Sequence, residues 1–152
     1  EGPVVMALSR QKLPLYDETG KAALKGGYVL KDCEGTPELI LIGTGSEVEL
    51  CVKAYEQLSA EGVAVRVVSM PCQEVFDAQC AEYKESVLPI AVRKRIAVEA
   101  GCSFGWQKYV GLDGDTLCID HFGASAPADI LFKEFGFTAE NLIAKARKML
   151  NK

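Results

Sequence analysis

The sequence predicts a three-layer α/β/α fold, in which helices cover both faces of a mixed five-stranded sheet with one antiparallel strand. Short apolar runs bounded by glycine or proline alternate with amphipathic stretches along the chain. Residues 39–68 contain a complete strand–turn–helix–strand unit, which is typical of a right-handed βαβ crossover. The connection between runs 28–32 and 39–42 is too short for a parallel crossover, so these two strands are expected to pair antiparallel.

The central βαβ unit opens with Leu39–Ile42, four large apolar residues that indicate a strand buried on both faces. The Gly-Thr-Gly sequence at 43–45 predicts a tight turn. Ser46 and Glu49 have the S-x-x-E spacing of a capping box, which predicts that Ser46 is the N-cap of a helix. Gly62 is expected to end this helix in the left-handed conformation. The apolar face of the helix is predicted to consist of Val48, Cys51, Val52, Tyr55 and Leu58.

The remaining elements follow from apolar periodicity and from helix start and stop signals. The other strands are expected at 4–8, 28–32, 63–68, 95–100 and 116–120. Helices are expected at 79–88, 104–109, 127–135 and from Thr138 onward, with short helical turns within 74–77 and within the linker 12–27. A buried-type run at 4–8 needs neighbouring strands, so we interpret the sequence as a piece of a longer chain whose first strand completes a sheet elsewhere.

Composition restricts the classes of protein to which the chain can belong. Of its 152 residues 49% are hydrophobic and 25% charged, as in an ordinary globular domain. The net charge of −4 argues against nucleic acid or an anionic membrane as a main partner, and no apolar run approaches the ~20 residues of a membrane span. The six cysteines form no C-x-x-C pair, so reduced thiols in the cytoplasm are expected rather than a zinc site.

The Gly-Thr-Gly turn at 43–45 has two interpretations. Gly-x-Gly at a helix N-terminus is how dinucleotide folds hold pyrophosphate. Here the third glycine is replaced by Val48, and Glu47 and Glu49 place two carboxylates in the first turn, where they would repel a phosphate. We therefore interpret this segment as a structural turn.

Three other sets of side chains are candidates for ligand binding or catalysis. His121, the only histidine, could act as an acid or base, but no serine, cysteine or second histidine is linked to it by a motif. Three aromatic residues, Phe104, Trp106 and Tyr109, could stack a ligand, although core or interface packing is the more frequent use of this spacing. The basic run 93–95 is interpreted as a solvated strand entrance.

Arg10 is the strongest candidate for a binding residue. It lies between Ser9 and Gln11, just after the run 4–8, so two further hydrogen-bonding side chains flank it. A planar guanidinium can hold a phosphate or carboxylate at two points. From the residues alone, however, a surface salt bridge is the favoured role of such an arginine.

Five stretches closely resemble the C-terminal part of the transketolase family, and together they extend over essentially the whole chain in order. They are ALSRQ (7–11), GGYVLKD (26–32), GTGSEVEL (43–50), VRVVSMP (65–71) and FGASAPADILFKEFGFT (122–138). The resemblance implies a cytoplasmic, homodimeric transferase of the pentose phosphate pathway, which moves a two-carbon ketol unit between phosphorylated sugars with thiamine diphosphate and Mg²⁺ (or Ca²⁺). It also implies the five-stranded mixed sheet predicted above.

The same resemblance assigns parts of the chain. Residues 1–25 correspond to the end of a preceding domain and a linker, and residues 26–152 to the C-terminal domain. In the family the cofactor lies between the other two domains, so no cofactor, metal or catalytic residue is expected here. The arginine of the S-R-Q motif contacts the sugar phosphate, which implies this role for Arg10, with Ser9 and Gln11 as possible neighbours. His121 lies just outside the matching stretch and receives no role.

Two alternatives remain open. The chain could be the C-terminal domain of another thiamine diphosphate enzyme, such as a 2-oxoacid dehydrogenase subunit or deoxyxylulose phosphate synthase, although the S-R-Q motif and the sequence 122–138 favour transketolase. It could also be a stand-alone ligand-binding or assembly module. In that case a nucleotide would be expected at the turn 43–47.

Overall fold

A computed structural model describes residues 2–151 of the chain. The strands are β1 (Tyr28–Lys31), β2 (Leu39–Gly43), β3 (Val65–Ser69), β4 (Arg95–Val98) and β5 (Asp115–Leu117). The α-helices are α1 (Val48–Ala60), α2 (Gln73–Asp77), α3 (Ala81–Val87), α4 (Gln107–Val110), α5 (Ala128–Glu134) and α6 (Ala139–Leu150). Two short 3₁₀ helices are η1 (Lys21–Lys25) and η2 (Gly45–Glu47).

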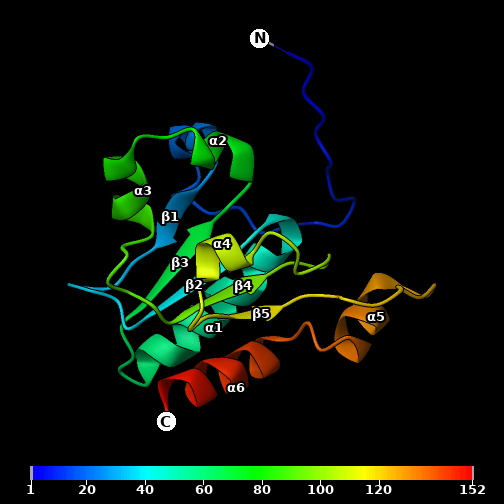
Figure 1. The fold of residues 1–152 in the computed structure, drawn as a ribbon. Coiled ribbons are helices and arrows are strands. Elements are labelled where there is room, and N and C mark those ends of the chain that lie inside the picture. Colours follow the sequence, from blue (N-terminus) through cyan, green and yellow to red (C-terminus); the bar gives the residue numbers. More distant parts are fainter. Residues whose placement is uncertain (1, 152) are drawn as a thin grey trace.

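The strands form one sheet in the order β1-β3-β2-β4-β5 (Figure 1). β1 is antiparallel to β3, while β2 is parallel to both β3 and β4, and β4 is parallel to β5. This arrangement confirms the predicted mixed five-stranded sheet with one antiparallel strand. In the sheet β3 lies on one side of β2, and β4, the next strand in the chain, lies on the other side.

The predicted partner of β1 was wrong. β1 pairs with β3, where Tyr28 lies opposite Ser69, and not with β2. A short connection requires β1 and β2 to run in opposite directions, but it does not require them to be neighbours. Strands two places apart in a sheet are only about 10 Å apart, and residues 32–38 can easily span that distance past the start of β3.

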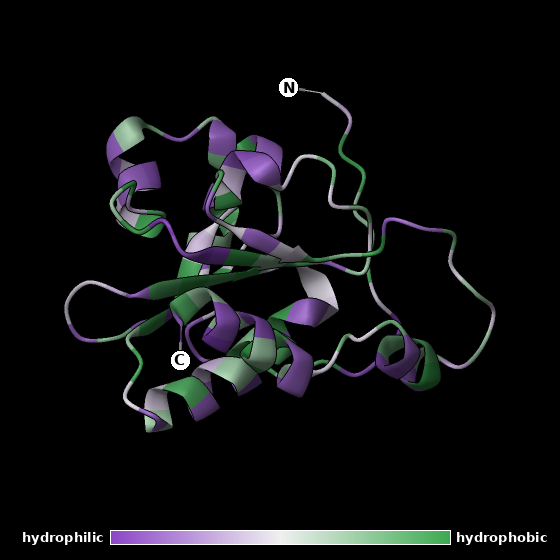
Figure 2. Cartoon of the chain, turned by 60° about the horizontal axis from the view of Figure 1, so that its bottom comes forward, coloured by the Kyte–Doolittle hydropathy of each residue, from purple (hydrophilic) through white to green (hydrophobic). Residues whose placement is uncertain are grey.

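Helices cover both faces of the sheet and close two cores. Alternate residues of β2 serve the two cores, because successive side chains of a strand point to opposite faces: Leu39 and Leu41 belong to the first core, whereas Ile40 and Ile42 belong to the second. The first core is closed by α1 and α6, and the second by α2, α3 and α4. In Figure 2 the central strands are largely hydrophobic, while α1 and α6 carry both hydrophobic and hydrophilic residues, as amphipathic helices should.

One buried cation joins three elements. Arg66 of β3 donates from Nε and Nη2 to the two carboxylate oxygens of Asp32, both at 2.9 Å. Its Nη1 donates to the carbonyl oxygens of Ser86 and Val87, at 2.8 and 3.1 Å. The side chain of Arg66 therefore ties the end of β1 and the C-terminal end of α3 to the edge of the sheet.

The segment 4–8, expected to be a strand, has no regular structure and pairs with no strand among residues 2–151. Its large apolar side chains are exposed, from 73% for Met6 to 95% for Val5. A β-strand needs hydrogen bonds from a neighbour, and the described part of the chain supplies none. This segment is the dark-blue stretch that leads away from the sheet in Figure 1.

The linker after this segment is attached to the sheet at several points. Tyr16 packs against the first core, and the Tyr28 hydroxyl donates to Thr19 Oγ1 at 3.2 Å. The short helical turn predicted within 12–27 is η1. The division into residues 1–25 and 26–152 stays a prediction. Within residues 2–151, no helix combines the length and hydropathy needed to cross a membrane.

Candidate functional site

The Ser9–Gln11 motif lies on the surface. All three side chains are exposed, and the backbone bends at Arg10 and Gln11. Because the segment 4–8 is not a strand here, Arg10 does not follow a strand end as the sequence had suggested. Within residues 2–151 its guanidinium makes no hydrogen bond or ion pair. The surface salt bridge that the residues alone favoured is therefore absent from the described part of the chain.

A groove of about 250 Å³ lies directly beside the motif. Gln11 and Leu13 line it together with side chains from the start of α1 and from α5, including Leu50 and Phe132. Its charged groups balance, since Lys12 and Lys53 are matched by Glu49 and Asp129, and Glu49 already accepts from Lys53 Nζ at 2.6 Å. The balanced charge of this groove does not favour a multiply charged anion.

The turn after β2 has the packing of a structural turn, and its buried carboxylate disfavours a phosphate. A Cβ added to Gly43 would lie 2.9 Å from Val48 Cα, so this glycine is needed for the close approach of strand and helix. Glu47, only 5% exposed, accepts from Ser46 Oγ at 2.6 Å and from the backbone amide of Ala100. Burial raises the pKa of Glu47, and these hydrogen bonds only partly offset that shift. The structural interpretation of this turn is the one that fits.

The predicted capping box, however, is wrong. Residues 45–47 form the 3₁₀ turn η2, α1 begins at Val48, and the Ser46 hydroxyl donates to the carboxylate of Glu47 instead of accepting from a helix amide. Glu49 pairs with Lys53 one turn later. The sequence pattern did not reveal that the next residue, Glu47, is a buried acceptor that competes for the hydroxyl. The other end of the helix is as expected, since Gly62 has φ +82°.

The aromatic candidates divide into core and surface. Trp106 is 1% exposed, donates from Nε1 to Glu99, and packs edge-on against Tyr109 with ring centroids 5.8 Å apart. Phe104 is 91% exposed. Core packing is therefore correct for Trp106 and Tyr109, and no stacked aromatic pair is left open to a ligand at this place.

His121 is exposed, and its Nδ1 lies 2.8 Å from the carbonyl oxygen of Phe122. Its ring packs edge-on against Phe135, with centroids 5.1 Å apart. Among the hydrogen bonds of residues 2–151, none joins this imidazole to a serine or cysteine side chain. The local geometry is that of a surface histidine held by its neighbours.

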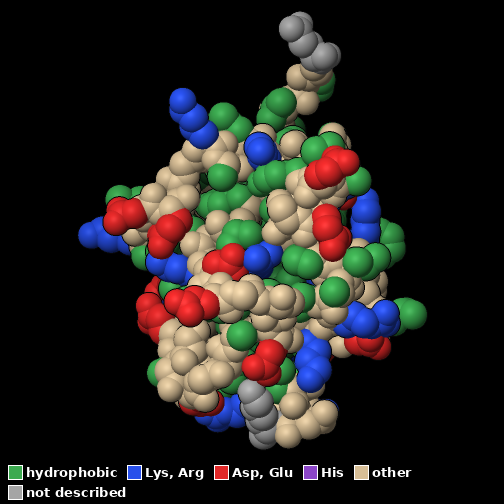
Figure 3. Space-filling model, turned by 90° about the vertical axis from the view of Figure 1, so that its left-hand side faces the viewer, with side chains coloured by type: hydrophobic (Ala, Val, Ile, Leu, Met, Phe, Trp, Pro, Cys, Tyr) green, Lys and Arg blue, Asp and Glu red, His purple; other side chains and the backbone are tan. Residues whose placement is uncertain are grey.

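The basic run 93–95 is only partly solvated, which corrects the interpretation from sequence. Arg93 is exposed and pairs with Asp113. Arg95 instead turns inward and donates to backbone carbonyls. Figure 3 shows basic and acidic side chains mixed over one face of the molecule.

The described residues do not form a cluster of metal ligands. No three His, Cys, Asp or Glu side chains of residues 2–151 come together to hold a metal ion. Each cysteine in the described part of the chain is a free thiol, and burial raises the pKa of Cys118 to about 11. The donor set of residues 2–151 therefore does not fit the divalent metal that the resemblance implies.

The family of the chain follows from its match to known proteins. A family model described as a transketolase-like TK C-terminal domain matches residues 26–138, well over half of the chain. The chain belongs to the transketolase family. It is 57% identical to transketolase 1 of Escherichia coli (strain K12) and 58% identical to transketolase 1 of Vibrio cholerae, in each case over 99% of this chain and 23% of the relative. A transketolase of Solanum tuberosum named as chloroplastic is 55% identical over 97% of the chain and 20% of its own length.

Solved transketolases also share the fold. The transketolase of Leishmania mexicana matches 92% of this chain with a TM-score of 0.85 at 41% identity. The Pichia stipitis enzyme in complex with sedoheptulose-7-phosphate matches 93% with a TM-score of 0.84 at 40% identity. In both cases the match is 20% of the solved chain. The chain thus spans about a fifth to a quarter of the transketolases it resembles, as expected for a C-terminal domain of this family.

Proposed function

We propose that this chain acts as the C-terminal part of a transketolase, an enzyme that transfers a two-carbon ketol unit between phosphorylated sugars in the pentose phosphate pathway. In this proposal the chain contributes Arg10, with Ser9 and Gln11 beside it, to the binding of the sugar phosphate. It also packs against the other domains and a second subunit of a homodimer. The 57% identity to the Escherichia coli enzyme supports transketolase over the other thiamine diphosphate enzymes.

The single observation that carries the role of Arg10 is its free guanidinium. Arg95 and Arg66 bind groups of the domain itself, whereas Arg10 has no partner within residues 2–151 and lies on a segment outside the sheet. An arginine in this state can offer both edges of its fork to an anion. The Pichia stipitis relative was solved with a sugar phosphate, sedoheptulose-7-phosphate, which is the class of ligand we propose for Arg10.

The remaining parts of the enzyme are proposed to hold the cofactor. Thiamine diphosphate and Mg²⁺ (or Ca²⁺) would be bound by domains other than this one. The cytoplasm is the location we propose, and the chloroplastic name of the Solanum tuberosum relative makes a plastid the competing location. We expect neither nucleic acid nor membrane among the main partners.

The test is the substitution Arg10→Ala in the full-length transketolase. A charge-assisted hydrogen bond to phosphate is worth about 1.5–3 kcal/mol. At about 1.4 kcal/mol per decade, its loss should raise KM for phosphorylated sugars about 10- to 150-fold. Turnover at saturation should fall much less, because the contact exists in both the ground state and the transition state. Arg10→Lys should recover only part of the affinity.

Two controls accompany this measurement. Lys12→Ala removes a positive charge two residues away in the same segment. It should change KM by less than about twofold, because salt screens an exposed charge that does not contact the phosphate. Hydroxypyruvate with an unphosphorylated acceptor should react almost equally in all variants. If Arg10→Ala impairs the reaction of phosphorylated and unphosphorylated substrates equally, Arg10 has a structural role and the proposal fails.

A stand-alone binding module is the competing function. Its natural site would be the turn at 43–47, where the buried carboxylate of Glu47 and the close packing of Gly43 both disfavour a phosphate. Saturable nucleotide binding at this turn would favour that function over ours.

A further inference from the structure

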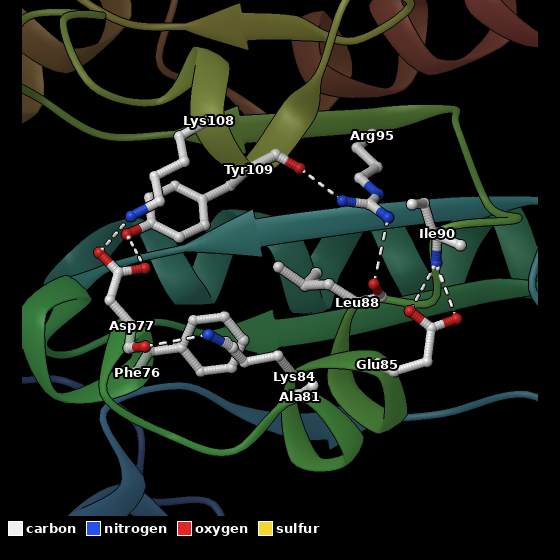
Figure 4. A pocket seen from close by; sticks show the side chains of 10 residues that line it. All are labelled: Phe76, Asp77, Ala81, Lys84, Glu85, Leu88, Ile90, Arg95, Lys108 and Tyr109. Carbon is white, nitrogen blue, oxygen red and sulfur yellow. Dashed lines mark hydrogen bonds and ion pairs between the residues drawn. The ribbon is translucent and has the colours of Figure 1, made fainter.

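A second pocket, of about 390 Å³, lies on the face of the sheet covered by α2, α3 and α4. Its apolar walls include Phe76, Leu88 and Tyr109, all of which belong to the second core. Charged side chains surround these walls (Figure 4). The volume falls within the range of about 300–1,000 Å³ that is usual for small-molecule sites. The pocket shares no lining residue with the groove beside Gln11.

Both carboxylates of the pocket are already engaged by donors from the chain. Asp77 accepts from Lys108 Nζ at 2.6 Å and from the Tyr109 hydroxyl at 3.1 Å. Glu85 accepts from the backbone amide of Ile90 with both oxygens, at 3.0 and 3.1 Å. Their negative charge is therefore directed to partners at the edges of the pocket (Figure 4).

Two cations of the pocket, Arg95 and Lys84, bind carbonyl oxygens instead of carboxylates. Arg95 donates to the carbonyls of Val92, Tyr109, Leu88 and Pro89 at 2.7–3.2 Å, so two segments, the connection 88–92 and α4, hold the guanidinium in place. Lys84 Nζ donates to the carbonyl of Asp77 at 3.0 Å. Neither cation forms an ion pair within residues 2–151. Lys84 keeps two of its three donors unused, and Arg95 one of five.

Burial makes the lack of a carboxylate partner more costly for Arg95. It lowers the pKa of Arg95, which means that the charged guanidinium loses hydration at this position, and the charge of Glu85 only partly compensates. An additional negative charge would improve the environment of Arg95. A pocket with held carboxylates, unpaired cations and apolar walls therefore favours a ligand that is negatively charged at one end and apolar at the other.

We propose that this pocket binds a small organic carboxylate with a ring-sized apolar body. Lys84 and Arg95 would attract the carboxylate, and the ring would lie against Phe76, Leu88 and Tyr109. A cavity of about 150 Å³ is enough for a benzene ring, so the pocket has room for a ring and an acidic group. This inference is independent of the role proposed for Arg10.

The test compares two probes of equal shape, phenylacetate and its neutral analogue phenylacetamide, by NMR titration of the 152-residue chain. Phenylacetate should bind saturably, with shifts centred on α3 and α4, and at least about tenfold more tightly than phenylacetamide, since one charge-assisted hydrogen bond is worth at least that factor. Equal binding of the two probes, or no saturable binding of phenylacetate, would overturn the proposal.

Variants locate the site. Lys84→Met keeps the length of the side chain but removes the charge, and should weaken phenylacetate binding about tenfold without affecting phenylacetamide. Lys133→Met, on exposed α5, is the matched control and should change nothing. Ala81→Phe fills the pocket from the start of α3 and should abolish binding of both probes. If phenylacetate binds Ala81→Phe as it binds the original chain, the pocket is not the site, whatever the outcome with Lys84→Met.

Discussion

Glu47 illustrates how one residue can change the role of its neighbours. Glu47 follows the carboxyl end of β2, where Gly43 is paired with Val98 of β4, and it is almost completely buried. A buried carboxylate requires hydrogen-bond donors. Ser46 supplies one of them, and its hydroxyl is consequently not available as a helix cap.

We predict that Ser46→Ala lowers the free energy of unfolding by about 1.5–3 kcal/mol, the range for a hydrogen bond to a charged group. Glu49→Ala should cost only about 0.2–0.5 kcal/mol, because it removes a single i,i+4 ion pair on the surface of α1. Urea denaturation at pH 7 measures both. Similar losses for the two variants would mean that the pair forms a capping box in solution.

The pH dependence of stability should also depend on Glu47. Because its pKa is raised in the folded state above the ordinary value of 4.5, the folded chain binds more protons than the unfolded chain between these two values. The contribution of Glu47 to the free energy of unfolding is therefore greatest at acid pH and decreases as the pH rises through the folded-state pKa. Urea denaturation at a series of pH values gives the free energy of unfolding of the original chain and of Glu47→Gln. The original chain should lose stability relative to Glu47→Gln as the pH rises through the folded-state pKa of Glu47.

Asp115 provides a control of opposite sign. Burial raises its pKa, but the hydrogen bonds from Lys145 and from the Thr116 amide outweigh that effect, so the net pKa is below 3.8. Its contribution is present above that value and is lost as the pH falls through the folded-state pKa. Asp115→Asn should accordingly reduce stability at neutral pH and matter least in acid. Parallel pH profiles for the two variants would contradict this assignment of charges.

Some residue roles were predictable from the sequence and others were not. Gly62 and Thr138 end and begin helices as expected, because both roles depend only on local backbone geometry: Thr138 Oγ1 accepts from the Asn141 amide at 3.2 Å. Ser46 and Arg95 were misinterpreted. Their partners, a buried carboxylate and the carbonyls of other segments, are defined by tertiary packing.

At the scale of elements, β1 is attached by more than its backbone ladder: Tyr28 and Leu30 lie in the first core, and Arg66 binds Asp32 just after the strand. Arg66, which is 8% exposed, holds Asp32 at the end of this edge strand and at the same time holds the end of α3. The register of β1 on β3 is already irregular between Val29 and Lys31. The arginine thus fixes a strand whose hydrogen-bond ladder is short.

Asp32→Ala should lower the free energy of unfolding by about 1–3 kcal/mol, because it leaves a buried guanidinium without its charged acceptor. Asp113→Ala is the matched control, since it breaks an exposed ion pair with Arg93 that is worth about 0–1 kcal/mol. Thermal unfolding of both variants gives the comparison. If the two losses are equal, burial of Arg66 has no special effect and the role assigned to it is wrong.

The elements themselves were largely predictable, and their pairing was less so. All five strands of the sheet occur where apolar runs indicated them, within one to three residues, because each run is long enough to be buried. The neighbour of β1 was missed, since loop length restricts direction but not adjacency. The run 4–8 had strand composition, but hydrogen-bonding partners decide whether such a run forms a strand. For the same reason, nothing in the local sequence indicated the pocket beside Arg95, whose lining comes from four elements and loops.

At the scale of the whole molecule, the chain closes its own cores but exposes apolar side chains in one segment. Both faces of the sheet are covered by helices, and the core side chains of β2, β3 and β4 are fully buried. In contrast, most large apolar residues of segment 4–15 are exposed, with Leu15 at 99%. Within the proposed function, this segment is where the rest of the enzyme would pack.

We therefore predict that the 152-residue chain folds cooperatively but does not catalyse ketol transfer. It should show a single urea transition by circular dichroism and by tryptophan fluorescence, with Trp106 as the fluorescent probe of the second core. With thiamine diphosphate, Mg²⁺ and phosphorylated sugars added, it should give no turnover above the buffer. Tight thiamine diphosphate binding together with turnover of a ketose phosphate would refute this prediction.

The assignment of the two cores to different parts of the chain has a consequence for synthesis on the ribosome. Every buried residue of the second core precedes Gly111, whereas the first core needs α6, which ends at Leu150. At about 5–20 residues per second, α6 follows Val110 by roughly 2–8 s. During that interval the part of α1 that packs against α6 has no cover, although α1 already contacts β2 and β3, so a nascent chain of this protein offers chaperones a hydrophobic surface on one defined face of the sheet.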